Sequence, residues 1–244
     1  LNVPEEIELA EMLIKIHPWA DCVRYARTGG ESMSIAIRIA RACTKKDKIL
    51  FCGYHGWHDW YLSANLKSKK ILNKHLLPDL EPTGVPKGLK DTLISFKFND
   101  WNDIEKIVKK KAKSCAAIVL EPCRDELPKK NYLKELRMIA NKNNCILIFD
   151  EITCAWRMQT SGAHKNFGVN PDIAVFGKTI ANGIPMGAII GKKNVMKFAA
   201  KTFISSAFWT EKIGPACSIA FIKKHKKLNL GKKLILIGKE IKKI

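Results

Sequence analysis

The feature that most limits what this 244-residue chain can fold into is an alternation of short apolar runs with amphipathic stretches. The clearest run, residues 145–149, leads directly into Asp150 and Glu151. Further strands are predicted where other apolar runs occur, at residues 49–52, 115–120, 172–176 and 187–191. Helical spacing predicts helices between them at residues 101–113 and 132–141. This alternation predicts an α/β fold with a mostly parallel sheet and helices on both faces, in three layers.

Polar side chains follow the predicted strands at the points where those strands end. Asp150 and Glu151 come after one buried run, and Lys178 comes after the run at residues 172–176. Ligands of such sheets bind beyond the carboxyl ends of the strands, so we expect these three residues to share one crevice. Residues 65–93 are rich in proline and glycine and predict a long loop that could cover this crevice.

Lys178 stands between a buried strand and a segment rich in glycine and small residues, Gly177-Lys-Thr-Ile-Ala-Asn-Gly183. A lysine in such a site can lose its proton and form an imine with an aldehyde. The alternative is an ordinary surface lysine, in a chain with 43 lysine and arginine residues. The position alone leaves both interpretations open.

A glycine pair, Gly29 and Gly30, precedes a helical pattern that continues to about residue 41. Free backbone N–H groups and the helix dipole at such a start can hold a phosphate. The alternative is an ordinary glycine turn before a helix. On its own this motif is a weak indication of an anion site.

Two other kinds of site fit the sequence poorly. The DE-ended strand resembles that of a P-loop ATPase, but Asp172 occupies the position of the required glycine before Gly177-Lys-Thr179, and that segment follows the strand instead of preceding it. His55 and His58 have i,i+3 spacing but lack an evident third metal ligand, so an aromatic platform for a planar ligand is favoured. The eight cysteines include no CxxC pair.

The net charge of +20 allows two interpretations. A basic face could hold nucleic acid, or the lysines could simply cover solvated helix faces. The lysines are spread in small clusters without interleaved aromatic residues, which favours the second interpretation. No apolar run is long enough for a membrane span, and no signal peptide is evident. We therefore expect a cytoplasmic protein that binds neither nucleic acid nor a membrane.

Taken together and in order, the motifs of residues 20–220 resemble the class III (fold type I) pyridoxal-phosphate-dependent aminotransferases, and most of all the glutamate-1-semialdehyde 2,1-aminomutase group. The matching segments are Thr28-Gly-Gly-Glu-Ser32, Gly53-Tyr-His-Gly56, Leu120-Glu-Pro122, Ile148-Phe-Asp-Glu-Ile152, Asn170-Pro-Asp172, Phe176-Gly-Lys178 and Gly183-Ile-Pro-Met-Gly187. Several ordered motifs with family-like spacing are specific as a set, although each one alone is not.

This resemblance implies roles for particular residues. Lys178 would hold pyridoxal 5'-phosphate as a Schiff base, the internal aldimine, and would later act as the base that moves the α-proton. Asp150 would pair with the pyridine nitrogen and keep it protonated, so that the ring acts as an electron sink. The backbone N–H groups of Gly29 and Gly30 would grip the phosphate, although relatives often have a hydroxyl residue where Gly30 stands.

The resemblance further implies that Tyr54 stacks on one face of the cofactor ring and that Ile152 packs on the other. It also implies a homodimer with the site at the subunit interface. Relatives supply a threonine to the partner's phosphate, and that position is Ala207 here. Thr210 lies nearby and is the candidate to replace it.

Residues 1–215 would form the cofactor-binding large domain, with its N-terminal part truncated. Residues 216–244 would form a connecting helix toward a missing C-terminal domain. The implied activity is amino-group transfer on a small amino acid, amino-aldehyde or keto substrate. Aminotransferase and intramolecular 2,1-aminomutase remain open, as does the substrate. The alternatives are an inactive truncated member serving as a binding or assembly module, and a basic nucleic-acid-binding protein.

Overall fold

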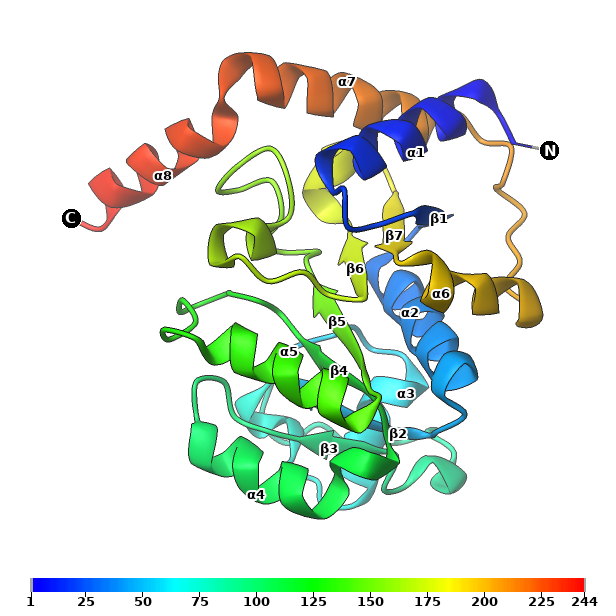
Figure 1. Ribbon diagram of the computed structural model, residues 1–244, viewed down its shortest axis with the longest axis vertical. Coiled ribbons are helices and arrows are strands. Elements are labelled where there is room, and N and C mark those ends of the chain that lie inside the picture. The colour runs from blue at the N-terminus through cyan, green and yellow to red at the C-terminus, as the bar shows by residue number, and fades with distance from the viewer. Residues whose placement is uncertain (1, 244) are drawn as a thin grey trace.

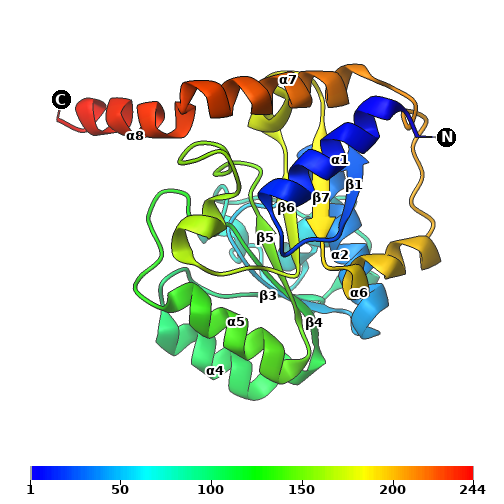
Figure 2. The ribbon, with the colours of Figure 1, turned by 45° about the horizontal axis from the view of Figure 1, so that its top comes forward.

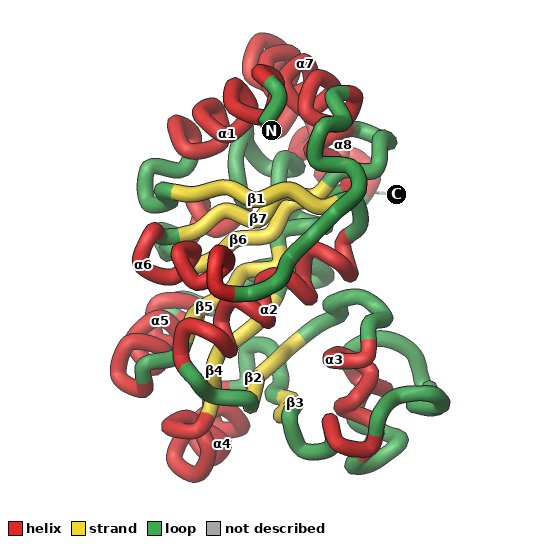
Figure 3. The backbone as a smooth tube through the Cα atoms, turned by 90° about the vertical axis from the view of Figure 1, so that its right-hand side faces the viewer, coloured by secondary structure: helices red, strands yellow, loops and turns green. Residues whose placement is uncertain are grey.

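The computed structural model describes residues 2–243. Seven strands form one sheet in the order β1-β7-β6-β5-β4-β2-β3 (Figure 3). The strands are β1 (Cys22–Ala26), β2 (Lys48–Cys52), β3 (Leu93–Ser95), β4 (Cys115–Leu120), β5 (Ile146–Asp150), β6 (Ile173–Phe176) and β7 (Gly187–Gly191). Five neighbouring strands, β3, β2, β4, β5 and β6, are parallel. Strand β7 is antiparallel to both of its neighbours, β6 and β1. The prediction of a mostly parallel sheet is confirmed.

Helices cover both faces of the sheet and complete the predicted three layers (Figure 1). They are α1 (Pro4–Ile16), α2 (Gly29–Thr44), α3 (Asp59–Leu62), α4 (Trp101–Lys111), α5 (Tyr132–Asn143), α6 (Lys193–Met196), α7 (Ile213–Leu228) and α8 (Leu230–Ile241). One face packs against α2, and the opposite face packs against α4, α5, α1 and α7. Among residues 2–243, no helix combines the length and the apolar character needed to cross a membrane.

The central strand β5 is buried on both faces of the sheet, which explains why its sequence is a continuous apolar run. Ile146 and Ile148 join the core beneath α2, whereas Leu147 and Phe149 join the core beneath α4 and α5. A parallel strand buried on both faces needs apolar side chains in both directions. The run ends at Asp150, which therefore lies at the carboxyl edge of the sheet.

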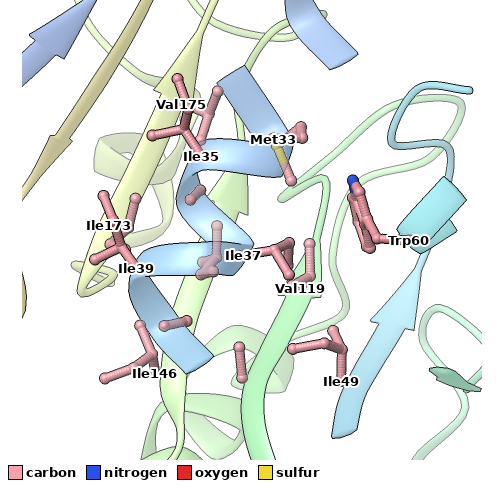
Figure 4. Close-up of a cluster of buried hydrophobic side chains, with 14 of the residues drawn as sticks. Met33, Ile35, Ile37, Ile39, Ile49, Trp60, Val119, Ile146, Ile173 and Val175 are labelled. Atoms are coloured by element: carbon pink, nitrogen blue, oxygen red, sulfur yellow. The ribbon is translucent and has the colours of Figure 1, made fainter. Parts of the chain in front are cut away.

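Helix α2 begins at a capping box and buries one apolar face. The side-chain oxygen of Thr28 accepts a hydrogen bond from the backbone N–H of Glu31, and the carboxylate of Glu31 accepts from the N–H of Thr28 in return. Figure 4 shows Ile35 and Ile39 of α2 beside strand β6, within the buried cluster on this face. The cap and this packing fix where the first turn of α2 stands relative to the strand ends.

Two helices, α7 and α8, occupy most of residues 216–244, the range for which the sequence predicts one connecting helix. Helix α7 begins at Ile213, and its Ile219 and Ile222 pack in the same core cluster as α1, which lies alongside it (Figure 2). The chain then turns at Asn229, whose φ is 47°, and continues as α8. The boundary at residue 215 and the further domain stay predictions.

Candidate active site

A cavity of about 810 Å³ opens beyond the carboxyl ends of β5 and β6, beside the first turn of α2. Six of the seven residues predicted for the cofactor site line it: Gly29, Gly30, Tyr54, Asp150, Ile152 and Lys178. The seventh, Thr210, is exposed in the turn at residues 207–210 and is not part of this lining. The cavity therefore brings together segments that are far apart in the sequence.

Lys178 follows β6 after one glycine and has a left-handed backbone, with a φ of 43°. For a residue with a Cβ this conformation costs about 1–2 kcal/mol, so the surrounding structure must hold it in place. Its Nζ donates a hydrogen bond of 2.8 Å to Oγ1 of Thr153, a residue that also lines the cavity. The amine thus lies at the cavity wall with one neutral partner.

Asp150 is the last residue of β5 and is only 3% exposed. Its Oδ2 lies 2.8 Å from Nδ1 of His55, and its Oδ1 accepts the backbone N–H of Ile152 at 3.1 Å. A buried carboxylate is stable when it is paired and hydrogen-bonded. Asp150 meets that condition while its side chain still lines the cavity.

The first turn of α2 presents donors to the cavity. Gly29 and Gly30 are its first two residues, and within residues 2–243 neither backbone N–H has a hydrogen-bond acceptor. The first N–H groups of a helix have no partner inside the helix and carry the positive end of its dipole. They therefore form a binding site for an anion such as a phosphate group.

Ile152 packs closely against two glycines, and this contact shapes the slot beside Lys178. A Cβ on Gly29 would lie 3.1 Å from Cδ1 of Ile152, and one on Gly177 would lie 3.2 Å from its Cγ2. A larger residue at either position would displace Ile152 from its place in the cavity wall. The lining of the cavity fits pyridoxal phosphate. It combines the amine of Lys178, the buried carboxylate of Asp150, the first N–H groups of α2, and apolar and aromatic walls.

The neighbouring carboxylate of Glu151 turns away from the cavity. It is fully buried and accepts hydrogen bonds from Nδ1 of His164 at 2.7 Å and from the backbone N–H groups of Ala163 and His164. Burial alone would raise the pKa of Glu151, but these hydrogen bonds hold it below its usual value. Glu151 therefore anchors the loop between β5 and residue 164.

Glu121 lies on the other side of the Gly53 turn, where it accepts the backbone N–H of Tyr54 at 3.4 Å. Burial, and then the nearby charge of Asp150, raise the pKa of Glu121. It lines a second, smaller cavity together with Arg124 and does not line the first. Its contact with Tyr54 supports the aromatic wall of the main cavity.

Two residues of the site were not predicted in these roles. Thr153 carries no signal in the sequence beyond its place three residues after Asp150. His55 was considered as part of a metal pair or an aromatic platform, but its ring contacts Asp150, while His58 pairs with Ser34. In the part of the chain that the structure describes, no group of three or more His, Cys, Asp or Glu side chains could hold a metal ion.

Comparison with known protein families gives one match that extends over nearly the whole chain. The model of the family described as aminotransferase class-III matches residues 1–243. The chain is 35% identical over 226 residues to glutamate-1-semialdehyde 2,1-aminomutase of Ignicoccus hospitalis, which covers 89% of this chain and 52% of that protein. It is 34% identical over 221 residues to 3-aminobutyryl-CoA aminotransferase of Cloacimonas acidaminovorans, covering 88% of this chain and 49% of that protein.

Solved structures of transaminases share the fold. An omega-transaminase from Sphaerobacter thermophilus superposes with a TM-score of 0.81 at 26% identity, over 92% of this chain and 54% of that one. A transaminase with pyridoxal phosphate bound gives the same TM-score and identity over 91% of this chain and 54% of its own. The chain spans about half the length of the curated relatives it matches.

Proposed function

We propose that this chain, which belongs to the class-III aminotransferase family of pyridoxal-phosphate enzymes, binds that cofactor through Lys178 and moves an amino group. The observation that carries the proposal is that Lys178 and Asp150 line one cavity next to the first two N–H groups of α2, which have no acceptor within residues 2–243. Related proteins named as an aminotransferase and as aminomutases make intermolecular and intramolecular transfer both consistent with this site.

Lys178 would act first as the covalent anchor and then as a base. When bound, pyridoxal phosphate supplies an aldehyde carbon for imine formation and a ring that withdraws electrons. Once a substrate amine displaces it, the free amine of Lys178 would move a proton at the substrate α-carbon. The hydroxyl of Thr153, 2.8 Å from Nζ, would hold that amine at the cavity wall between these steps.

The other residues of the lining would bind and orient the group. The carboxylate of Asp150 would face the pyridine nitrogen and stabilise a proton there. The N–H groups of Gly29 and Gly30 would bind the phosphate. Tyr54 and Ile152 would pack on the two faces of the ring and exclude water from it.

The substrate would be a small amino acid, amino-aldehyde or keto compound, and the protein would act in the cytoplasm as a homodimer with the site at the subunit interface. Exposed aromatic side chains in the segment at residues 203–209 support a covered surface, because Phe203 is 88% and Phe208 is 57% exposed. Thr210 stands in the same exposed segment and would reach the phosphate site of the other copy.

Borohydride reduction followed by mass spectrometry tests the assignment of Lys178. The chain is incubated with pyridoxal phosphate and reduced, which converts an imine to a stable amine. We expect one adduct per chain on the peptide that contains Lys178, and no adduct there in Lys178→Ala. Lys110→Ala on the exposed face of α4 is the matched control and should keep the full adduct.

Two outcomes would contradict the proposal in different ways. A full adduct in Lys178→Ala would show that another lysine carries the cofactor. An unmodified chain that takes up no pyridoxal phosphate would instead support a non-catalytic binding or assembly module.

A further inference from the structure

The ring of His58 lies against the first turn of α2, in the place that a side chain on Gly30 would take. A Cβ on Gly30 would lie 2.8 Å from both Cδ2 and Nε2 of His58. The Cα–Cβ bond of a helical residue leans toward the N-terminus of its helix. The Cδ2–Nε2 edge of the ring therefore stands on the side of this turn where the N–H groups of Gly29 and Gly30 have no acceptor.

Glycines on both sides make this approach possible. The turn that carries His58 includes Gly56, whose φ is 95°. A Cβ on Gly56 would lie 2.9 Å from Cα of Gly30, which is closer than a real side chain allows. A residue with a Cβ at position 56 or at position 30 would force the turn and the helix apart. The contact of His58 with the first turn of α2 is therefore built into the backbone.

The other ring nitrogen fixes the orientation of the ring. Nδ1 of His58 lies 2.8 Å from Oγ of Ser34, and that hydroxyl lies 2.9 Å from the backbone oxygen of Gly30. A hydroxyl has one proton, and a carbonyl oxygen has none to donate. Both contacts are hydrogen bonds only if Nδ1 carries a proton of its own. Ser34 thus ties the ring to α2 through Nδ1 and leaves Nε2 as the free end.

A structural role explains Nδ1 but not Nε2. His58 is the N-cap residue of α3, yet its side chain makes no capping hydrogen bond. Its backbone oxygen accepts the N–H groups of Tyr61 and Leu62. Among residues 2–243, Nε2 has no hydrogen-bond partner, and it accepts neither N–H group of the first turn of α2. A free ring nitrogen next to two free N–H donors indicates a shared ligand that accepts hydrogen bonds.

The charges around His58 favour an anion as that ligand. His58 lines a cavity of about 580 Å³ beside the main one, together with Arg38, Arg41 and one acidic residue, Asp59. Trp57 lines both cavities and forms part of the wall between them. Histidine can carry a charge near neutral pH, and an imidazolium donates from both nitrogens at once. Hydrogen bonds from a charged donor to an anion are about twice as strong as neutral ones.

We propose that Nε2 of His58 donates a hydrogen bond to the cofactor phosphate, as a third donor beside the N–H groups of Gly29 and Gly30. The inference rests on the proposed function, because it places the phosphate of pyridoxal phosphate at the first turn of α2. A phosphate group presents three strong acceptor oxygens, which three donors around one turn can satisfy. His58 adds the side-chain contact to a site otherwise formed by backbone.

Equilibrium dialysis of the full chain tests this contact with two probes, pyridoxal phosphate and pyridoxal, which lacks the phosphate. His58→Asn places its amide near the position of Nδ1, where it can still reach Ser34, and has no atom at the position of Nε2. We expect it to weaken pyridoxal-phosphate binding about 10- to 100-fold, the range for a hydrogen bond to a charged group. Pyridoxal binding should stay unchanged, which also shows that the variant is folded.

His58→Gln is the matched control, because its amide lies near the position of Nε2 and can still donate. We expect it to lose less pyridoxal-phosphate affinity than His58→Asn does. Equal losses in the two variants would show that a donor at the position of Nε2 is not what binds the phosphate.

A pair of substitutions moves the donor from one residue to the other. Gly30→Ser alone should weaken pyridoxal-phosphate binding, because its Cβ would collide with the ring of His58. His58→Ala frees that space, and the serine hydroxyl can then donate to the phosphate from the same place. We expect the double variant to bind pyridoxal phosphate about tenfold more tightly than His58→Ala alone.

Three results would overturn the inference. The first is full pyridoxal-phosphate affinity in His58→Asn. The second is an equal loss of affinity for pyridoxal phosphate and pyridoxal, since that would place the effect away from the phosphate. The third is a double variant that binds no more tightly than His58→Ala.

The two proposals fail separately. A wrong assignment of Lys178 moves the borohydride adduct to another lysine and leaves the contrast between pyridoxal phosphate and pyridoxal in His58→Asn. A wrong assignment of His58 removes that contrast and leaves the adduct on Lys178. A chain with no affinity for pyridoxal phosphate would overturn both.

Discussion

The carboxylate of Glu151 should be among the largest single contributors to stability near the cavity, although it does not line it. Oε1 accepts the backbone N–H and the ring Nδ1 of His164, and Oε2 accepts the N–H of Ala163. All of these groups are fully buried or nearly so. Removing the carboxylate would therefore leave three buried N–H donors, and the thiol of Cys154, without this acceptor.

The cost follows from those donors. A buried donor left unsatisfied costs about 1–3 kcal/mol, so three of them together cost at least about 3 kcal/mol. We therefore expect Glu151→Ala to lower the free energy of unfolding by about 3–5 kcal/mol. Glu151→Gln keeps the shape and one accepting oxygen, so it should cost about half as much, roughly 2 kcal/mol.

Urea unfolding followed by circular dichroism measures both values. Glu105→Gln is the matched control, because Glu105 forms an exposed ion pair of 3.0 Å with Lys109 on α4. Such a pair contributes at most about 0.5 kcal/mol. If Glu151→Gln and Glu105→Gln have the same effect within about 0.5 kcal/mol, the reasoning from buried donors is wrong.

Two further predictions concern acid stability and packing. Burial, and then His164, lower the pKa of His17 to about 4, from 6.5 in the unfolded chain. The unfolded chain therefore binds the proton first, and the free energy of unfolding should fall by about 3 kcal/mol as the pH drops from 6.5 to 4. His17→Gln should flatten this slope in pH-dependent unfolding, and an unchanged slope would assign it to other groups. Gly187→Ala should lower stability by about 1–3 kcal/mol, because the new Cβ would collide with Oγ of Ser32. Ser32→Ala should restore part of that loss in thermal unfolding, and no restoration would place the strain elsewhere.

The sequence predicted the central part of the fold well. The strands β4 and β7 have the predicted bounds, β2 and β6 differ from prediction by one residue at one end, and β5 is shifted by one residue toward the C-terminus. Asp100 caps α4, with Oδ1 accepting the N–H of Asp103 at 3.0 Å. These segments are predictable because an apolar run buried on both faces, or a helix with a polar cap, is specified by local sequence.

Other elements had no such local signal. Strand β1 is only partly buried and becomes a strand by pairing antiparallel with β7, more than 160 residues away in the sequence. The turn at Asn229, which divides the predicted C-terminal helix into α7 and α8, likewise was not evident from apolar spacing. Pairing and helix ends of this kind depend on what the rest of the chain places nearby.

The sequence by itself determined the α/β class, the strand-end positions of Asp150 and Lys178, and the glycine pair before α2. The tertiary structure alone decided which side chains meet at those positions. It placed Thr153 on the amine of Lys178 and His55 on Asp150, and it turned Glu151 away from the cavity. The physical reason is that strand periodicity sets only the direction of a residue, whereas its partner depends on the packing of loops that carry no period.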